Sequence, residues 1–218
     1  MFIQLDSQII YYERTGEGHP LILLHGNGDD HTIYNELVAA LSDTYEIYAV
    51  DTRGHGSSAT PKAYHYGEMA ADITKLIKAL DIEKPSILGF SDGAILAMII
   101  GMEDPDLISH LILCGGNLSP KGLNHSSIKN IKKNYKKTED PLQKLMLDEP
   151  DIHPRDLSRI TVPTLVIAGS KDCIKKSETE NIAKNIPTSE LMIIPKENHS
   201  SYIAHTAYLA DKIRDFVK

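Results

Sequence analysis

Short runs of consecutive apolar residues alternate along the chain with stretches whose apolar residues recur every three or four positions. The first pattern is typical of strands that are covered on both faces, and the second of helices that pack one face against a core. We expect strands at 9–12, 21–24, 45–50, 86–88, 111–113, 164–167 and 191–194. This alternation predicts an α/β fold in which helices cover both faces of a mostly parallel central sheet.

Three stretches have the helical spacing most clearly. They are Ile33, Leu37 and Leu41; then Met69, Ile73, Leu76, Ile77 and Leu80; and, at the C-terminal end, Ile203, Ala207, Ala210, Ile213 and Val217. We interpret all three as helix faces that pack against the core.

Residues 117–158 interrupt the alternation. This stretch is rich in Lys and Asn and has prolines at 120, 141, 150 and 154. It is too short to form a core of its own, so we expect a small helical cap insertion that lies over the sheet. The remaining residues, 1–116 and 159–218, then form one core domain, which suits a chain of 218 residues with 41% hydrophobic and 24% charged residues.

Charge and composition exclude several classes of protein. A formal charge of −7 argues against a general nucleic-acid binder, and no apolar stretch is long enough to cross a bilayer. The first residues lack a basic segment followed by a long apolar one, so no signal peptide is expected. Two cysteines, Cys114 and Cys173, make no disulfide framework. We expect a cytoplasmic protein without membrane or nucleic-acid partners.

The segment 89–93 reads Gly-Phe-Ser-Asp-Gly and lies between a strand pattern and an apolar, small-residue-rich helix pattern. In that context G-x-S-x-G forms a nucleophile elbow, a tight turn that exposes the serine hydroxyl above the sheet. Side chains at Gly89 and Gly93 would collide with the crossing backbone, so glycine is required there. We therefore expect Ser91 to be a nucleophile rather than an ordinary turn serine.

A serine hydroxyl needs a base to take its proton and an acid to orient that base. Asp172 ends the turn after the strand at 164–167, and His199 follows the last strand. The turn after the preceding strand offers no carboxylate, and His205 lies within a helical stripe. The chain thus supplies a predicted Ser91, Asp172, His199 triad in the order Ser, Asp, His.

A hydrolase of this type also needs two backbone N–H groups that point at the developing oxyanion. The glycine-rich turn His25-Gly26-Asn27-Gly28 follows the strand at 21–24, and Asp92 begins the helix after the elbow. We expect the amides of Asn27 and Asp92 to form the oxyanion hole.

With these motifs and the segment Asp51-Thr52-Arg53-Gly54-His55-Gly56-Ser57, the chain resembles the α/β-hydrolase superfamily over most of its length outside 117–158. The resemblance implies that the D-x-R-G-x-G-x-S segment is structural. It also implies hydrolysis through an acyl-enzyme without metal or organic cofactor, and we expect a small carboxylic ester, thioester or lactone as substrate. The residue before His199 is Asn198, where many relatives have glycine, and the insertion is shorter than many lids, which indicates a more open pocket.

Some interpretations stay open at this point. Asp92 either selects a substrate amine or is a solvated carboxylate of the first helical turn, and the second reading is the simpler one. The lysines of the insertion are expected to be a solvated helix face, and no metal site is expected at His25, His31 and His55. An aminopeptidase, a carbon–carbon bond hydrolase and a ligand receptor with an idle triad are the alternative functions.

Overall fold

The computed structural model describes residues 1–6 and 8–218, which fold around an eight-stranded sheet. The strand order is β1-β2-β4-β3-β5-β6-β7-β8. The strands are β1 (Phe2–Leu5), β2 (Gln8–Thr15), β3 (His19–Leu24), β4 (Tyr45–Asp51), β5 (Ser86–Phe90), β6 (His110–Cys114), β7 (Thr164–Gly169) and β8 (Ser189–Ile194). In this order, every neighbouring pair from β4 through β3 to β8 is parallel. The pairs β1·β2 and β2·β4 are antiparallel. The predicted mainly parallel sheet is confirmed, and β1 is an addition that the sequence pattern did not indicate.

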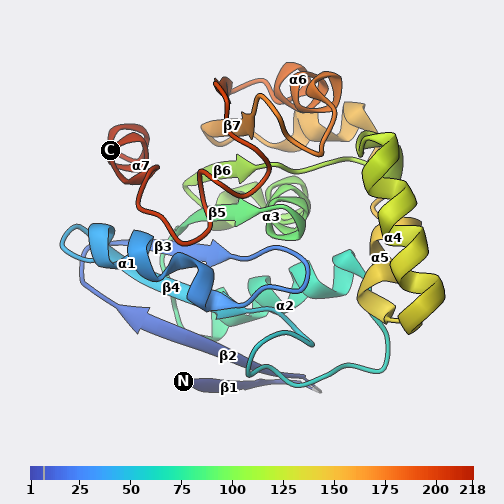
Figure 1. Ribbon diagram of the computed structural model, residues 1–218. Helices are drawn as coiled ribbons and strands as arrows, with labels where there is room; N and C mark the ends of the chain where they lie inside the picture. Colours follow the sequence, from blue (N-terminus) through green and yellow to red (C-terminus); the bar gives the residue numbers. More distant parts are fainter. Residues whose placement is uncertain (7) are drawn as a thin grey trace.

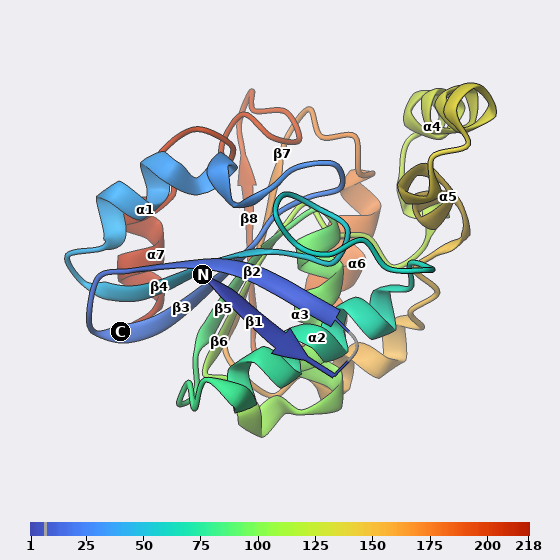
Figure 2. The ribbon, with the colours of Figure 1, turned by 90° about the horizontal axis from the view of Figure 1, so that it is seen from below.

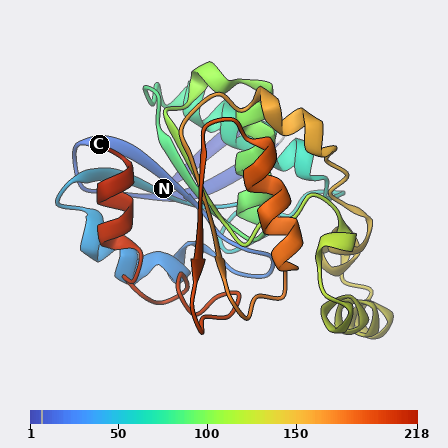
Figure 3. The ribbon, with the colours of Figure 1, turned by 90° about the horizontal axis from the view of Figure 1, so that it is seen from above.

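Helices cover both faces of this sheet, as predicted. They are α1 (Asn35–Leu41), α2 (Tyr66–Ala79), α3 (Asp92–Glu103), α4 (His125–Thr138), α5 (Pro141–Asp148), α6 (Lys176–Asn185) and α7 (Ala210–Phe216). Figure 2 shows α1 and α7 on one face and α2, α3 and α6 on the other. Figure 3 shows the same two layers from the opposite side. Within the described residues, no helix is both long and apolar enough to span a bilayer.

The two faces bury separate apolar clusters. One includes Leu88, Ile112 and Ile167 of the sheet with Leu37 of α1 and Ile213 of α7. The other packs the apolar residues of α2 and α3 against the opposite sheet face. Successive residues of a strand point to opposite faces, so strands buried between two helical layers must be apolar at every position. This explains the uninterrupted apolar runs of the sequence.

The expected C-terminal helix is wrong in its first half. Only residues 210–216 are helical, and the stretch 200–209 consists of turns in which Ala207 is exposed and His205 has a φ of 52°. Ile203 and Leu209 are nevertheless buried. The apolar residues of this segment are therefore buried although the backbone between His199 and α7 is irregular and not helical.

Residues 117–158 contain α4 and α5, which pack against each other beside the main body of the molecule (Figure 1). Their inner sides share a small cluster in which Leu123, Ile131 and Ile174 are buried. The lysines of α4 are exposed, which confirms that they form a solvated helix face.

Candidate active site

Ser91 lies in the turn between β5 and α3 with φ 54° and ψ −114°, a strained conformation for a residue with a side chain. A Cβ atom at Gly89 would lie 2.2 Å from the Gly93 carbonyl oxygen, and one at Gly93 would lie 2.0 Å from the Leu24 carbonyl oxygen. Both positions therefore require glycine, as the sequence predicts. The amide of Ser91 donates to the Cys114 carbonyl at 2.8 Å, which fixes the turn to β6.

The three residues of the predicted triad come together at the carboxyl edge of the sheet. The Ser91 hydroxyl lies 3.1 Å from Nε2 of His199, and Nδ1 of His199 lies 2.7 Å from Oδ1 of Asp172. With the imidazole proton on Nδ1, His199 donates to Asp172 and its Nε2 accepts from Ser91. The backbone amide of Ile174 also donates to Oδ1 of Asp172, at 2.8 Å, which holds the carboxylate in place.

Charge and burial act against each other at this pair. Burial by itself disfavours the imidazolium form of His199, but the hydrogen bond and negative charge of Asp172, together with the Cys173 side chain, raise the pKa of His199 above its usual value. Burial likewise opposes ionisation of Asp172, yet its hydrogen bonds to His199 and to the Ile174 amide lower the pKa of Asp172. The carboxylate is thus charged at neutral pH and stabilises a protonated His199.

Two residues beside the imidazole were not identified from the sequence. Gly115, directly after β6, has a φ of 63°, and a Cβ atom there would lie 2.8 Å from Cε1 of His199. On another side the Phe90 ring packs against the imidazole with 4.9 Å between ring centroids. Phe90 is the last residue of β5 and Gly115 directly follows β6, so both lie at the sheet edge that carries Ser91. This position at a strand end is the sequence signal by which they could have been found.

The loop after β3 lies against the elbow because the Gly93 amide donates to the His25 carbonyl at 3.1 Å. Asn27 of this loop and Asp92, the residue after Ser91, are neighbours, because Nδ2 of Asn27 donates to Oδ2 of Asp92 at 2.8 Å. Within residues 1–6 and 8–218, neither the Asn27 amide nor the Asp92 amide donates to a backbone carbonyl outside the helices and strands. The amides of Asn27 and Asp92 therefore remain the candidates for an oxyanion hole.

Comparison with known proteins identifies the family to which this fold belongs. The family model of the alpha/beta hydrolase fold matches residues 19–140, more than half of the chain. The chain belongs to the alpha/beta hydrolase fold family. It is similar to the protein "Serine hydrolase BPHL" of Homo sapiens, with 26% identity over 99% of this chain and 85% of the relative.

Solved structures of the same fold cover nearly the whole α/β-hydrolase chain. The esterase EaEST from Exiguobacterium antarcticum superposes with a TM-score of 0.85 at 24% identity, covering 99% of this chain and 98% of that one. Est816, described as an N-acyl homoserine lactone degrading enzyme, superposes with a TM-score of 0.83 at 22% identity over 99% of this chain and 100% of that one. At these identities the likeness shows the fold.

Asp92 is buried in this α/β-hydrolase, with only 4% of its surface exposed. The reading of Asp92 as a solvated carboxylate is therefore wrong: the tight elbow turns the first residue of α3 inward. Its Oδ2 accepts a hydrogen bond of 2.8 Å from Nδ2 of Asn27. Burial raises the pKa of Asp92, and hydrogen bonding to Asn27 and Tyr66 partly opposes that effect.

A cavity of about 440 Å³ opens above Ser91 and His199. Its apolar wall includes Leu123, Ile131 and Met146 from the segment 117–158. Its acidic side chains are Asp29, Asp92 and Glu149, and none of the described residues that line it is Lys or Arg. A ligand in this cavity therefore meets carboxylates and an apolar surface.

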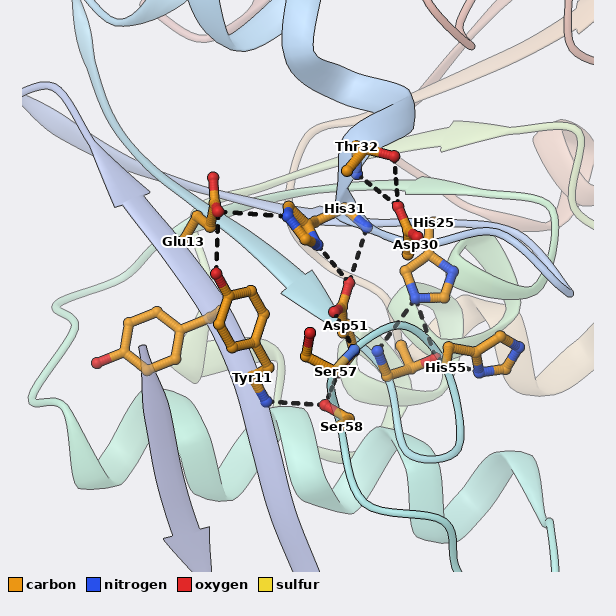
Figure 4. A network of polar contacts seen from close by, with 12 residues as sticks. Tyr11, Glu13, His25, Asp30, His31, Thr32, Asp51, His55, Ser57 and Ser58 are labelled. Carbon is orange, nitrogen blue, oxygen red and sulfur yellow. Dashed lines mark hydrogen bonds and ion pairs between the residues drawn. The ribbon is translucent and has the colours of Figure 1, made fainter.

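The D-x-R-G-x-G-x-S segment of the hydrolase takes part in a polar network (Figure 4). The carboxylate of Asp51 is fully buried and accepts from the amide and Nδ1 of His31, at 2.8 and 2.7 Å, and from the Ser57 amide at 2.8 Å. Burial, with the neighbouring His55, lowers the pKa of His25 to about 4, and its Nε2 accepts from the Thr52 amide at 3.1 Å. These contacts fix loops to one another, which is a structural role.

Proposed function

We propose that this chain is a serine hydrolase that cleaves a small carboxylic ester through an acyl-enzyme. The observation that carries this proposal is the hydrogen-bonded series from Ser91 through His199 to Asp172 at the floor of a cavity. A thioester or lactone would react by the same steps, because each presents an acyl carbon to the nucleophile and an acidic enough leaving group.

The proposed reaction has two halves. Ser91 attacks the carbonyl carbon while His199 takes its proton, and the amides of Asn27 and Asp92 bind the oxyanion. His199 then gives the proton to the leaving alcohol, which departs and leaves the acyl group on Ser91. In the second half His199 activates a water molecule that releases the acid. Asp172 keeps the imidazole oriented and stabilises its charged form throughout. A cytoplasmic location and a reaction without metal or organic cofactor stay predictions.

We propose that residues 117–158 act as a cap on a core made of 1–116 and 159–218. The cap supplies the apolar wall of the cavity, and its α5 also contacts the loop after β3, since Nδ2 of Asn27 donates to the Leu142 carbonyl oxygen at 3.4 Å. Substrate selection then depends on the cap, whereas the chemistry depends on the core.

Asp92 is proposed to favour substrates that carry an amino group near the scissile ester. A buried carboxylate attracts an ammonium group strongly because little water screens the pair, and no Lys or Arg among the described lining residues competes for it. Asp29 adds to the negative potential of the same cavity, whereas Glu149 is paired with His65 at 2.6 Å. Anionic substrates should bind poorly for the same reason.

Replacement of the nucleophile tests the chemistry. Ser91→Ala should lower turnover of p-nitrophenyl acetate by roughly 10⁶-fold and abolish labelling by a fluorophosphonate probe. Ser127→Ala, which removes another serine from the cavity wall, should keep the labelling. Near-normal esterase activity in Ser91→Ala would exclude the mechanism, and a folded native chain that the probe does not label would favour a ligand-binding module with an idle triad.

Matched substrates test the role of Asp92. Asp92→Asn should lower kcat/KM for the p-nitrophenyl ester of an α-amino acid more than for the ester of the same acid without the amine. Equal losses on both would exclude amine recognition. Two further substrates test the alternative functions. Hydrolysis of the corresponding amide faster than the ester would favour an aminopeptidase. Cleavage of a vinylogous diketone faster than the ester would favour a carbon–carbon bond hydrolase.

A further inference from the structure

Three potential metal ligands of different chemistry meet beside the nucleophile. Ligand atoms of Asp172, Cys173 and His199 all lie within 4.8 Å of one another. Cys173 is a free, partly exposed cysteine that lines the cavity. Cys173 packs against the small cluster of Leu123, Ile131 and Ile174, a contact that any small apolar side chain could make, and the proposed hydrolysis uses no thiol.

A second observation points to a ligand at the same place. Asp172 uses only one of its carboxylate oxygens: Oδ1 accepts from His199 and from the Ile174 amide, whereas Oδ2 is buried and accepts no hydrogen bond from the described residues. The Asp172 side chain is only 3% exposed. A buried carboxylate oxygen without a donor is costly, and a cation would satisfy it.

We propose that Asp172, Cys173 and His199 form an inhibitory binding site for Zn²⁺. Thiolate, imidazole and carboxylate are the three ligand types that zinc prefers, and three protein ligands leave one position for water. In a tetrahedral site the ligand atoms lie about 3.3–3.8 Å apart. The three ligand atoms lie within 4.8 Å of one another, and side-chain rotation at Cys173, which is not fully buried, can bring its sulfur to this spacing.

The geometry explains why zinc would stop the reaction. Binding releases the thiol proton of Cys173 to water, and the imidazole proton moves from Nδ1, which becomes the metal ligand, to Nε2. An Nε2 that carries a proton cannot accept the proton of Ser91. The ion also takes the charge of Asp172 that would otherwise stabilise the imidazolium form of His199. Hydrolysis therefore halts without any change to the nucleophile.

Zinc binding is tested first without reference to activity. In the Ser91→Ala protein, which keeps all three ligands, isothermal titration with Zn²⁺ should show one site. Adding Cys173→Ala should weaken that site at least about tenfold, as loss of a metal-site partner typically does. His205→Gln, which removes an exposed histidine six positions after His199, should leave it unchanged. Equal zinc affinity with and without Cys173 would overturn the site, and the more conservative Cys173→Ser repeats the comparison if the alanine variant misfolds.

The inhibitory effect rests on the proposed function and is measured separately. Zinc buffered with nitrilotriacetate should suppress hydrolysis of p-nitrophenyl acetate by the native chain, and EDTA should restore it. Each variant is compared with its own zinc-free rate, and Cys173→Ala should need at least about tenfold more free zinc. Zinc binding that depends on Cys173 in a chain without esterase activity would support the site and refute the function. Esterase activity that zinc leaves intact would refute the inhibitory site and support the function.

Discussion

Gly115 should control the activity of this hydrolase although it has no side chain. The substitution Gly115→Ala introduces a Cβ atom 2.8 Å from Cε1 and 3.0 Å from Nδ1 of His199. Ordinary contact begins at 3.4 Å, so the imidazole must withdraw by about 0.6 Å or the turn after β6 must shift. Either change displaces His199 from the geometry in which it forms the hydrogen bond of 3.1 Å with Ser91.

The expected magnitudes follow from this displacement. Misplacement of a catalytic group by about 1 Å can cost about 10²-fold in rate, and we expect kcat to fall by roughly that factor. The stability cost is smaller. Alanine in the left-handed conformation of Gly115 costs about 1–2 kcal/mol, which lowers the Tm of a domain of this size by about 2–8 °C.

A matched control separates strain from displacement. Gly28 also has a positive φ, of 76°, but a Cβ atom there meets nothing within 4 Å. Gly28→Ala should therefore cost a similar amount of stability and much less activity. Steady-state hydrolysis of p-nitrophenyl acetate and thermal unfolding of both variants provide the comparison. A Gly115→Ala protein with native kcat, or equal activity losses in the two variants, would refute the reasoning.

Three further predictions concern charge and buried polar groups. Because the base must be neutral and the pKa of His199 is raised, kcat should increase with pH through a midpoint above 6.5. Asp172→Asn should move that midpoint to lower pH and lower kcat by about 10⁴-fold. A pH profile of kcat that Asp172→Asn leaves unmoved would contradict this. Tyr202→Phe should stabilise the protein by about 1–3 kcal/mol in urea unfolding, because the Tyr202 hydroxyl is buried without a hydrogen-bond partner among the described residues, and a loss of stability would contradict it. Asp51→Asn should destabilise the protein by about 1–3 kcal/mol, because the single amide oxygen of Asn can accept only some of the three hydrogen bonds that Asp51 accepts. The kcat of the folded fraction should change little. A selective loss of kcat would instead place Asp51 in the catalytic machinery.

Local patterns of the sequence were sufficient for the fold and for the candidate triad. Apolar runs locate strands because the sheet is buried on both faces, and Gly89 and Gly93 locate the elbow because backbone crosses there. Ser91, Asp172 and His199 each follow a strand. Parallel strands bring their carboxyl ends to one edge of a sheet, so three residues far apart in sequence can be assigned to one site without coordinates.

Other features depended on contacts that no local pattern carries. Helix α6 is largely polar and was not identified, because only Thr179 and Ile182 of its residues are buried. The segment 200–209 has helical spacing but forms turns, in which His205 has a φ of 52° and its amide donates to the Ile33 carbonyl.

The sequence by itself therefore determined the order of elements and the residues of the candidate triad, since both depend on short-range rules of backbone geometry and burial. The tertiary structure alone decided the environment of those groups: the burial of Asp92, the approach of Gly115 to His199, and the meeting of Cys173 with Asp172 and His199. The physical reason is that solvent exposure and the distances between side chains are set by residues from different strands, whose mutual positions arise only when the sheet and its helical layers are packed.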